Sequence, residues 1–301
     1  MTVTFSTRIG PGFHYGTTPT FESMYFPAGE AHVKVINENT GKGPLTEVAR
    51  VYGADANDLL TLAMWADACH RRADARHKER PGDDPNRIVL VMPYLPGARA
   101  DHDDFVPFGA GVYADFINSL GADEVICFDP HSPVLPGLVN ATVIDSTRLV
   151  RKHVVGKISD SHPQRYDGII APDKGAVDRA SKVATACHLP LYRAEKHRVE
   201  ETGKLDGFSC EPLPESGRFL VVDDICDGGG TFLGLADVTG LPPERLGLYV
   251  SHGVFSGKAK DTLNTRYGEV WTTDSYAESA PEGMNAHIIP LAPTLNGYLA
   301  A

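Results

Sequence analysis

Short runs of apolar residues alternate along the chain with stretches in which apolar residues recur at the spacing of a helix face. Two stretches, 59–66 and 113–120, place apolar residues at i, i+3, i+4 and i+7, the pattern of an amphipathic helix. The runs typical of buried strands are 88–92, 125–128, 168–170, 219–222 and 246–250. Because parallel strands are joined by crossover helices and buried on both faces, this alternation predicts an α/β protein with parallel-rich sheets.

Two segments without this pattern are expected to be solvated loops. Residues 71–87 are dense in charge and contain a run of Pro, Gly and Asp at 81–85. Residues 200–215 carry two glycines and two prolines. A domain boundary is expected near 145–152, because several βα units lie on each side of it.

Composition and charge narrow the classes of protein. The 301 residues carry a formal charge of -11, with 28 Lys and Arg against 39 Asp and Glu, which argues against a protein that coats nucleic acid. No apolar run reaches the roughly 18 residues that cross a bilayer. The first residues lack a signal-peptide pattern, and the five cysteines form no CxxC pair. We therefore expect a cytoplasmic protein with no membrane and no nucleic-acid partner.

The strongest chemical pattern lies at residues 219–234. An apolar strand is followed by Asp223 and Asp224, and then by a glycine-rich turn, 227–231, that leads into a helix. Ligands of open α/β sheets bind beyond the carboxyl ends of strands, and backbone N–H groups of such a turn bind phosphate. Carboxylates repel a phosphate, so the two acids suit ribose hydroxyls or a magnesium ion.

This segment resembles the signature shared by the type I phosphoribosyltransferases and the ribose-phosphate diphosphokinases (PRPP synthetases). Six more segments resemble elements of the second family and occur in its order along the chain. They are 24–35, 92–102, 127–133, 169–180, 194–204, and 251–259 taken with 272–275. A phosphoribosyltransferase would explain 219–234 but neither 127–133 nor 194–204.

The resemblance implies a fold and an activity. The fold would be two similar phosphoribosyltransferase-like domains, each a parallel-rich sheet flanked by helices. The ATP-binding domain would span 1–147 and the domain with the signature 148–286, with the tail 287–301 packing back on the first. The activity would be transfer of the diphosphoryl group of ATP to the anomeric hydroxyl of ribose 5-phosphate, giving PRPP and AMP.

The resemblance also implies roles for residues of this sequence. The catalytic residues would be Lys196 and Arg198. The ATP-binding residues would be Phe26, Glu30, Arg99, Asp101 and His131. The ribose-phosphate-binding residues would be Asp223, Asp224, Asp227, Gly228, Gly229, Gly230 and Thr231. The metal-binding residues, for magnesium (Mg2+), would be Asp129, His131 and Asp173.

Several positions depart from the family's usual residues, among them His102 and His197, the latter in place of the middle arginine of the catalytic loop. Gly228 stands where threonine is common, and Ala28 and Ala100 stand where aspartate and glutamine are usual. A wider turn with fewer hydroxyl groups leaves open a related diphosphokinase that uses ADP-ribose as acceptor. A non-catalytic regulatory subunit is a further alternative, although the presence of the catalytic and metal-binding residues argues against it.

The expected ligands are therefore ATP and a phosphorylated ribose acceptor. Members of the family assemble as dimers and hexamers, so the resemblance implies a homo-oligomer. In such an assembly Phe26 and Glu30 would reach into the base pocket of a neighbouring copy.

Overall fold

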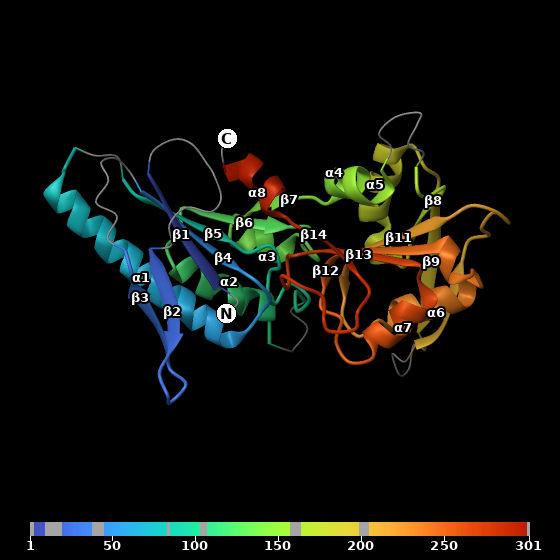
Figure 1. The fold of residues 1–301 in the computed structure, drawn as a ribbon, viewed down its shortest axis with the longest axis horizontal. Helices are drawn as coiled ribbons and strands as arrows, with labels where there is room; N and C mark the ends of the chain where they lie inside the picture. Colours follow the sequence, from blue (N-terminus) through green and yellow to red (C-terminus); the bar gives the residue numbers. More distant parts are fainter. Residues whose placement is uncertain are drawn as a thin grey trace. The chain divides into compact units, whose positions relative to one another are not determined.

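The computed structural model describes residues 3–9, 20–37, 45–82, 85–102, 107–156, 164–198 and 205–299. The chain forms two compact units (Figure 1). Unit 1 comprises Met1–Ile144 and Leu291–Ala301, and unit 2 comprises Asp145–Pro290. None of the helices in the described ranges has the length and apolar character that crossing a membrane requires.

Unit 1 is built on a five-stranded sheet of order β1-β4-β5-β6-β7. Its strands are β1 (Val3–Ile9), β4 (Leu45–Val51), β5 (Arg87–Val91), β6 (Glu124–Phe128) and β7 (Thr142–Ile144). The last four are parallel, and β1 is antiparallel to β4. The helices are α1 (Ala56–Glu79), α2 (Gly109–Ser119), α3 (Val134–Leu138) and α8 (Ala292–Leu299), and β2 (Phe21–Tyr25) pairs with β3 (Ala31–Val35) in a hairpin.

The core of unit 1 packs α1 against the sheet. Trp65 of α1 is fully buried and stacks on Phe5 of β1, with the ring centroids 5.6 Å apart. The helix begins where the Asp55 side chain accepts a hydrogen bond from the backbone N–H of Asn57, an N-cap. It then continues to Glu79, so the prediction of a loop over 71–87 is wrong for most of that segment. Most of its charged residues face solvent, where Arg71 pairs with Asp67 four residues earlier, whereas Arg72 turns inward to the buried Glu47 of β4.

Unit 2 is built on a seven-stranded sheet of order β10-β9-β8-β11-β12-β13-β14. Its strands are β8 (Gly168–Ala171), β9 (Leu191–Arg198), β10 (Leu205–Cys210), β11 (Phe219–Cys226), β12 (Leu246–Gly253), β13 (Glu269–Thr273) and β14 (His287–Ile289). All pairs are parallel except β10 with β9. The α-helices are α4 (Thr147–Leu149), α5 (Val177–Cys187), α6 (Gly230–Thr239) and α7 (Ala259–Arg266), and the short helices are η1 (Val150–Val155), η2 (Lys174–Ala176) and η3 (Pro243–Arg245).

The fold class predicted from the sequence is confirmed: both units carry parallel-rich sheets flanked by helices. Strand β11 lies between β8 and β12, and its residues 219–224 are buried, so the residues at its carboxyl end stand in the middle of the sheet. One local prediction fails here as well. Residues 205–210, expected to lie in a loop, form strand β10 because they pair antiparallel with β9.

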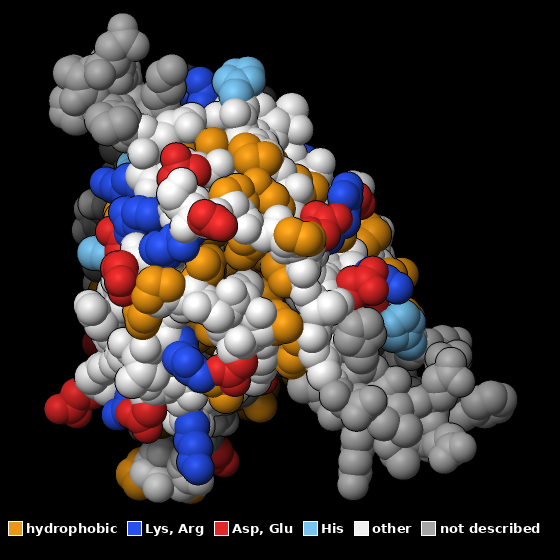
Figure 2. All heavy atoms as spheres, turned by 90° about the vertical axis from the view of Figure 1, so that its right-hand side faces the viewer, with side chains coloured by type: hydrophobic (Ala, Val, Ile, Leu, Met, Phe, Trp, Pro, Cys, Tyr) orange, Lys and Arg blue, Asp and Glu red, His pale blue; other side chains and the backbone are white. Residues whose placement is uncertain are grey.

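The surface carries charges of both signs. On the face drawn in Figure 2, acidic and basic side chains stand next to one another with apolar side chains between them. The described atoms of that face therefore form no continuous field of positive charge, which binding to a phosphate backbone requires.

Candidate functional site

A glycine turn connects the central strand β11 to helix α6. Gly229 precedes α6 with a φ of 78°, and a Cβ there would lie 3.3 Å from the backbone Cα of Ala259. A side chain at this position would be strained by the backbone conformation and crowded by that neighbouring backbone atom. A Cβ at Gly228 or Gly230 would meet no atom within 4 Å. The helix has no side-chain N-cap, so no side chain caps its first backbone N–H groups, a feature shared with anion-binding turns.

A neighbouring segment holds this turn in place. The Ser256 hydroxyl donates a hydrogen bond of 2.6 Å to Oδ1 of Asp227, and the Ser256 backbone N–H donates to the carbonyl oxygen of Asp227 at 3.1 Å. The backbone N–H of Phe255 donates to the carbonyl oxygen of Cys226 at 3.0 Å. Asp227 thus takes part in fixing the shape of the turn, and Ser256 is a supporting residue to which sequence reasoning gave no role.

Asp223 and Asp224 form a buried acid pair within β11. Only 8% and 5% of their surfaces are exposed. The sequence had suggested that the two acids follow the strand. The strand instead runs on to Cys226, so both acids lie inside it. Burial raises the pKa of Asp223 well above its ordinary value, and the nearby charges of Asp224 and Asp173 raise it further.

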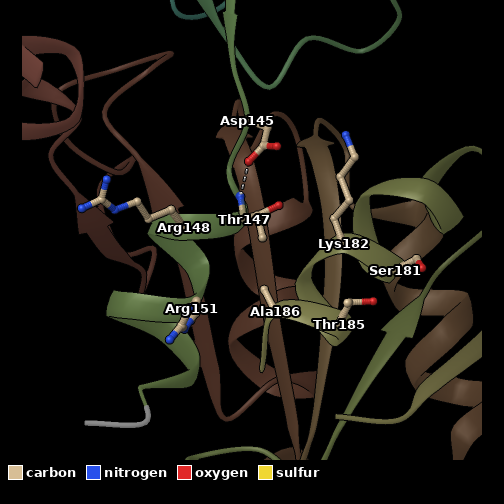
Figure 3. A pocket seen from close by; sticks show the side chains of 8 residues that line it. All are labelled: Asp145, Thr147, Arg148, Arg151, Ser181, Lys182, Thr185 and Ala186. Atoms are coloured by element: carbon tan, nitrogen blue, oxygen red, sulfur yellow. Dashed lines mark hydrogen bonds between the residues drawn. The ribbon is translucent and has the colours of Figure 1, made fainter. Parts of the chain in front are cut away.

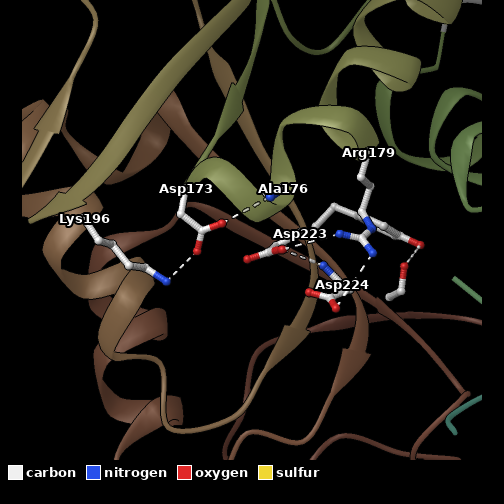
Figure 4. Close-up of polar contacts among 8 residues, drawn as sticks. Asp173, Ala176, Arg179, Lys196, Asp223 and Asp224 are labelled. Atoms are coloured by element: carbon white, nitrogen blue, oxygen red, sulfur yellow. Dashed lines mark hydrogen bonds and ion pairs between the residues drawn. The ribbon is translucent and has the colours of Figure 1, made fainter. Parts of the chain in front are cut away.

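Arg179 of helix α5 spans the acid pair (Figure 4). Its Nη1 lies 3.8 Å from Oδ1 of Asp223, and its Nη2 lies 3.8 Å from Oδ2 of Asp224. The arginine side chain is 13% exposed, so this contact is shielded from water. Sequence reasoning missed Arg179. The available signal was a single cation, six residues after Asp173, at the start of the helix that follows β8.

Asp173 and Lys196 contact each other directly. Asp173 follows β8, and its Oδ1 accepts a hydrogen bond of 3.1 Å from the backbone N–H of Ala176, which caps η2. Its Oδ2 accepts a hydrogen bond of 2.5 Å from Nζ of Lys196 on the neighbouring strand β9 (Figure 4). The structure thus brings together Asp173, a predicted metal-binding residue, and Lys196, a predicted catalytic residue.

Other predicted residues of unit 2 lie on the same elements. Arg198 is the last residue of β9, but its side chain lies outside the described residues, as do residues 199–204 of the predicted catalytic loop. Thr231 lies in the first turn of α6 and is half-buried.

In unit 1 the predicted ATP-binding residues form two groups. In the first, a hydrogen bond with Ser132 lowers the pKa of Asp101, with smaller contributions from the nearby charges of His102 and His131. Arg99 and His131 are exposed. The second group is the tip of the β2–β3 hairpin, where the backbone N–H of Phe26 donates to the carbonyl oxygen of Glu30 at 2.9 Å.

The described residues contain no group of three His, Cys, Asp or Glu side chains placed to hold a metal ion. In unit 1, Asp129 is buried, with a φ of 41°. In unit 2, Asp173 adds negative charge beside the acid pair, an excess that a divalent cation would neutralise. Magnesium in phosphoryl-transfer sites uses one or two carboxylates and takes its other ligands from phosphates and water. The acidic residues of unit 2 fit that pattern.

A separate groove of about 630 Å³ lies in unit 2 between α4–η1 and α5, and none of the predicted site residues lines it. In Figure 3 the side chains of Arg148, Arg151 and Lys182 point away from one another. The groove does not gather its positive charge at one point, so we assign it no ligand.

The two parallel-rich sheets, with a glycine turn and an acid pair at the carboxyl end of a central strand, define the class. It is that of the α/β proteins whose candidate ligand site lies at this edge of a sheet. No protein-family model matches the chain. Curated relatives do match over most of its length.

The chain is 29% identical over 284 residues to a ribose-phosphate pyrophosphokinase of Hyphomonas neptunium, covering 91% of this chain and 85% of the relative. It is 29% identical over 293 residues to one of Vibrio vulnificus, covering 91% and 84%. The phosphoribosylpyrophosphate synthetase of Mycobacterium smegmatis has the same fold, with a TM-score of 0.73 over 93% of this chain and 88% of that chain, at 22% identity. The predicted resemblance to the ribose-phosphate diphosphokinases, also called pyrophosphokinases, is confirmed.

Proposed function

We propose that this protein is a ribose-phosphate diphosphokinase, an enzyme that transfers the diphosphoryl group of ATP to ribose 5-phosphate and forms PRPP and AMP. Relatives with that name match 91% of the chain. The observation that carries the proposal is the geometry at the carboxyl end of β11. There a glycine turn follows a buried acid pair after two further residues of the strand, and a Cβ at Gly228 or Gly230 would meet no atom within 4 Å; both features lie within a single unit.

The acceptor would bind through its two kinds of polar group. The backbone N–H groups of residues 227–231 would hold the 5-phosphate, helped by the N-terminus of α6. Asp223 and Asp224 would accept hydrogen bonds from the ribose hydroxyls. Arg179 lies 3.8 Å from each of these carboxylates and places a positive charge beside them.

In the reaction, the anomeric hydroxyl oxygen attacks the β-phosphorus of ATP. The bond from that phosphorus to the oxygen bridging to the α-phosphorus breaks, AMP leaves with the electron pair, and the hydroxyl proton is released to solvent. Magnesium bound to the phosphates would supply charge neutralisation. Lys196 and Arg198 would stabilise the charge on the group in transfer. Such local cations are needed because the protein carries a net charge of -11.

The nucleotide side of the proposal rests on unit 1. Arg99, Asp101 and His131 would contact ATP, and the hairpin tip would contact its base. The tip residue Phe26 is 44% exposed, an unfavourable setting for an aromatic ring in water. A second copy of the chain would cover it, so a homo-oligomer is part of the proposal. A cytoplasmic location is also part of it, because all five cysteines are free thiols.

Nucleotide analysis tests the function. The purified protein is incubated with ATP, magnesium and ribose 5-phosphate, and the products are separated by anion-exchange chromatography and identified by ³¹P NMR. We expect AMP and PRPP in equal amounts. A parallel incubation with ADP-ribose tests the acceptor. Formation of AMP with ADP-ribose but not with ribose 5-phosphate would show that the proposed acceptor is wrong. If neither acceptor gives AMP, the proposed function is wrong.

A further inference from the structure

We propose that Lys196 and a divalent cation compete for one carboxylate oxygen of Asp173, so that binding of the cation frees the Lys196 ammonium group. The competition concerns only residues of unit 2. Its consequence for catalysis rests on the proposed function, because only there does a freed Lys196 act on a phosphoryl group.

The two oxygens of Asp173 have different tasks. Oδ1 accepts the backbone N–H of Ala176 and is tied to the start of η2. Oδ2 accepts Nζ of Lys196 at 2.5 Å. Only Oδ2 can therefore change partner without undoing the local fold. The two side chains are 25% and 21% exposed, so water and ions reach the contact while it remains partly shielded.

The surrounding charge favours a cation at this oxygen. Asp173 is close enough to the acid pair to influence Asp223, and Arg179 is already shared between Asp223 and Asp224. Lys196 is the cation that balances the negative charge of Asp173. A divalent cation would supply twice that charge at the same oxygen, and Lys196 would then be repelled from it.

Linkage makes the competition reciprocal. If a cation weakens the Lys196–Asp173 contact, then removal of Lys196 strengthens binding of the cation by the same free energy. For a partly buried ion pair we expect this to be about a fivefold to tenfold change in affinity. Lys196 would then be freed mainly when the metal is present, which restricts its action to metal-loaded substrate.

The chain provides a matched control. Lys174 stands next to Asp173 in the sequence and reaches across the same two elements to Glu195, with Nζ and Oε1 4.0 Å apart. Its side chain is 84% exposed, and its contact is with Glu195, not with Asp173. Lys174→Met removes the same charge from the same neighbourhood as Lys196→Met but leaves Oδ2 of Asp173 paired.

The first experiment measures metal binding without any reaction. Mn²⁺ is titrated into the full-length protein, and free Mn²⁺ is followed by electron paramagnetic resonance. We expect Lys196→Met to lower the dissociation constant about fivefold to tenfold and Lys174→Met to change it less than twofold. Equal affinities in all three proteins, or the same gain in both variants, would overturn the competition.

The second experiment reports on Lys196 itself. Amine acylation is quantified by mass spectrometry, with Lys174 as the internal reference. Added Mg²⁺ should raise the acylation rate of Lys196 several-fold. Asp173→Asn, which keeps an oxygen to cap η2, should raise the rate without Mg²⁺ and abolish the metal effect. A Lys196 rate that responds to neither change would refute the proposal.

The two proposals fail separately. Protein that makes no AMP but shows the Mn²⁺ and acylation effects would refute the diphosphokinase function and leave the competition standing. Protein that makes PRPP while Lys196 responds neither to metal nor to Asp173→Asn would do the reverse.

Discussion

Two acidic sites lie toward the carboxyl ends of neighbouring parallel strands of the same sheet, one just after β8 and the other within β11, and the protein neutralises them in different ways. After β8, Asp173 is a quarter exposed and contacts one lysine at 2.5 Å. In β11, Asp223 and Asp224 are buried and share one arginine at 3.8 Å from each. A buried charge left without a partner is strongly destabilising, whereas a partly exposed one can be solvated by water. The β11 site is thus a fixed part of the fold, and the β8 site can exchange its partner.

The largest expected effect concerns the exchangeable site. Lys196→Ala should lower the rate of AMP formation about a thousandfold, because it removes a charge needed only while the phosphoryl group is in transfer. ATP binding, measured by isothermal titration calorimetry, should change less than threefold. Turnover near that of the wild type would remove Lys196 from the mechanism.

The fixed site should respond to loss of its arginine with a loss of stability. Arg179→Met keeps the length of the side chain but leaves the acid pair without its cation. We expect the free energy of unfolding at pH 8 to fall by about 2–3 kcal/mol, measured by urea denaturation. Lys196→Met serves as the control and should cost less than about 1 kcal/mol, because its partner is partly solvated. Equal losses would mean that the two acidic sites do not differ as described.

Two glycines of the turn differ in how they should tolerate a side chain: at Gly229 the backbone conformation disfavours one and a neighbour lies close, whereas Gly228 has open space around it. Gly229→Ala should lower stability by about 1–2 kcal/mol, since it places a side chain at a φ of 78° and 3.3 Å from Ala259. Gly228→Ala meets no atom within 4 Å and should leave the melting temperature nearly unchanged. Both should raise the KM for the acceptor if its phosphate approaches the turn. An unchanged KM in both would argue against a phosphate at this place.

The smallest expected effect depends on pH. A raised carboxyl pKa means that the folded protein binds the proton of Asp223 more tightly than the unfolded chain does. Its charge therefore destabilises the fold increasingly as the pH rises above the ordinary value of 3.8 and through the raised pKa. Asp223→Asn should then raise the melting temperature slightly at pH 8, but not at pH 4. A lower melting temperature at pH 8 would show that the pair with Arg179 more than offsets the burial.

The local sequence was sufficient wherever a pattern is short and self-contained. The apolar run at 219–222 predicted β11, and the glycines that follow it predicted the turn, because both depend on neighbouring residues. The same approach failed at 71–79, where charge density suggested a loop. A long helix there is supported by packing of its other face, including Trp65, against the sheet. It failed again at 205–210, where pairing with β9 decides the structure.

The sequence by itself determined the fold class and the order of strand, acids and glycine turn at β11, since hydrophobic spacing and this order are written in consecutive residues. Only the tertiary structure decided which cation meets which acid. Arg179 and Lys196 come from different elements, and their distances to Asp223, Asp224 and Asp173 depend on how α5 and β9 pack beside β8 and β11. Ion pairing acts over a few ångströms in space, and no pattern along the chain records that separation.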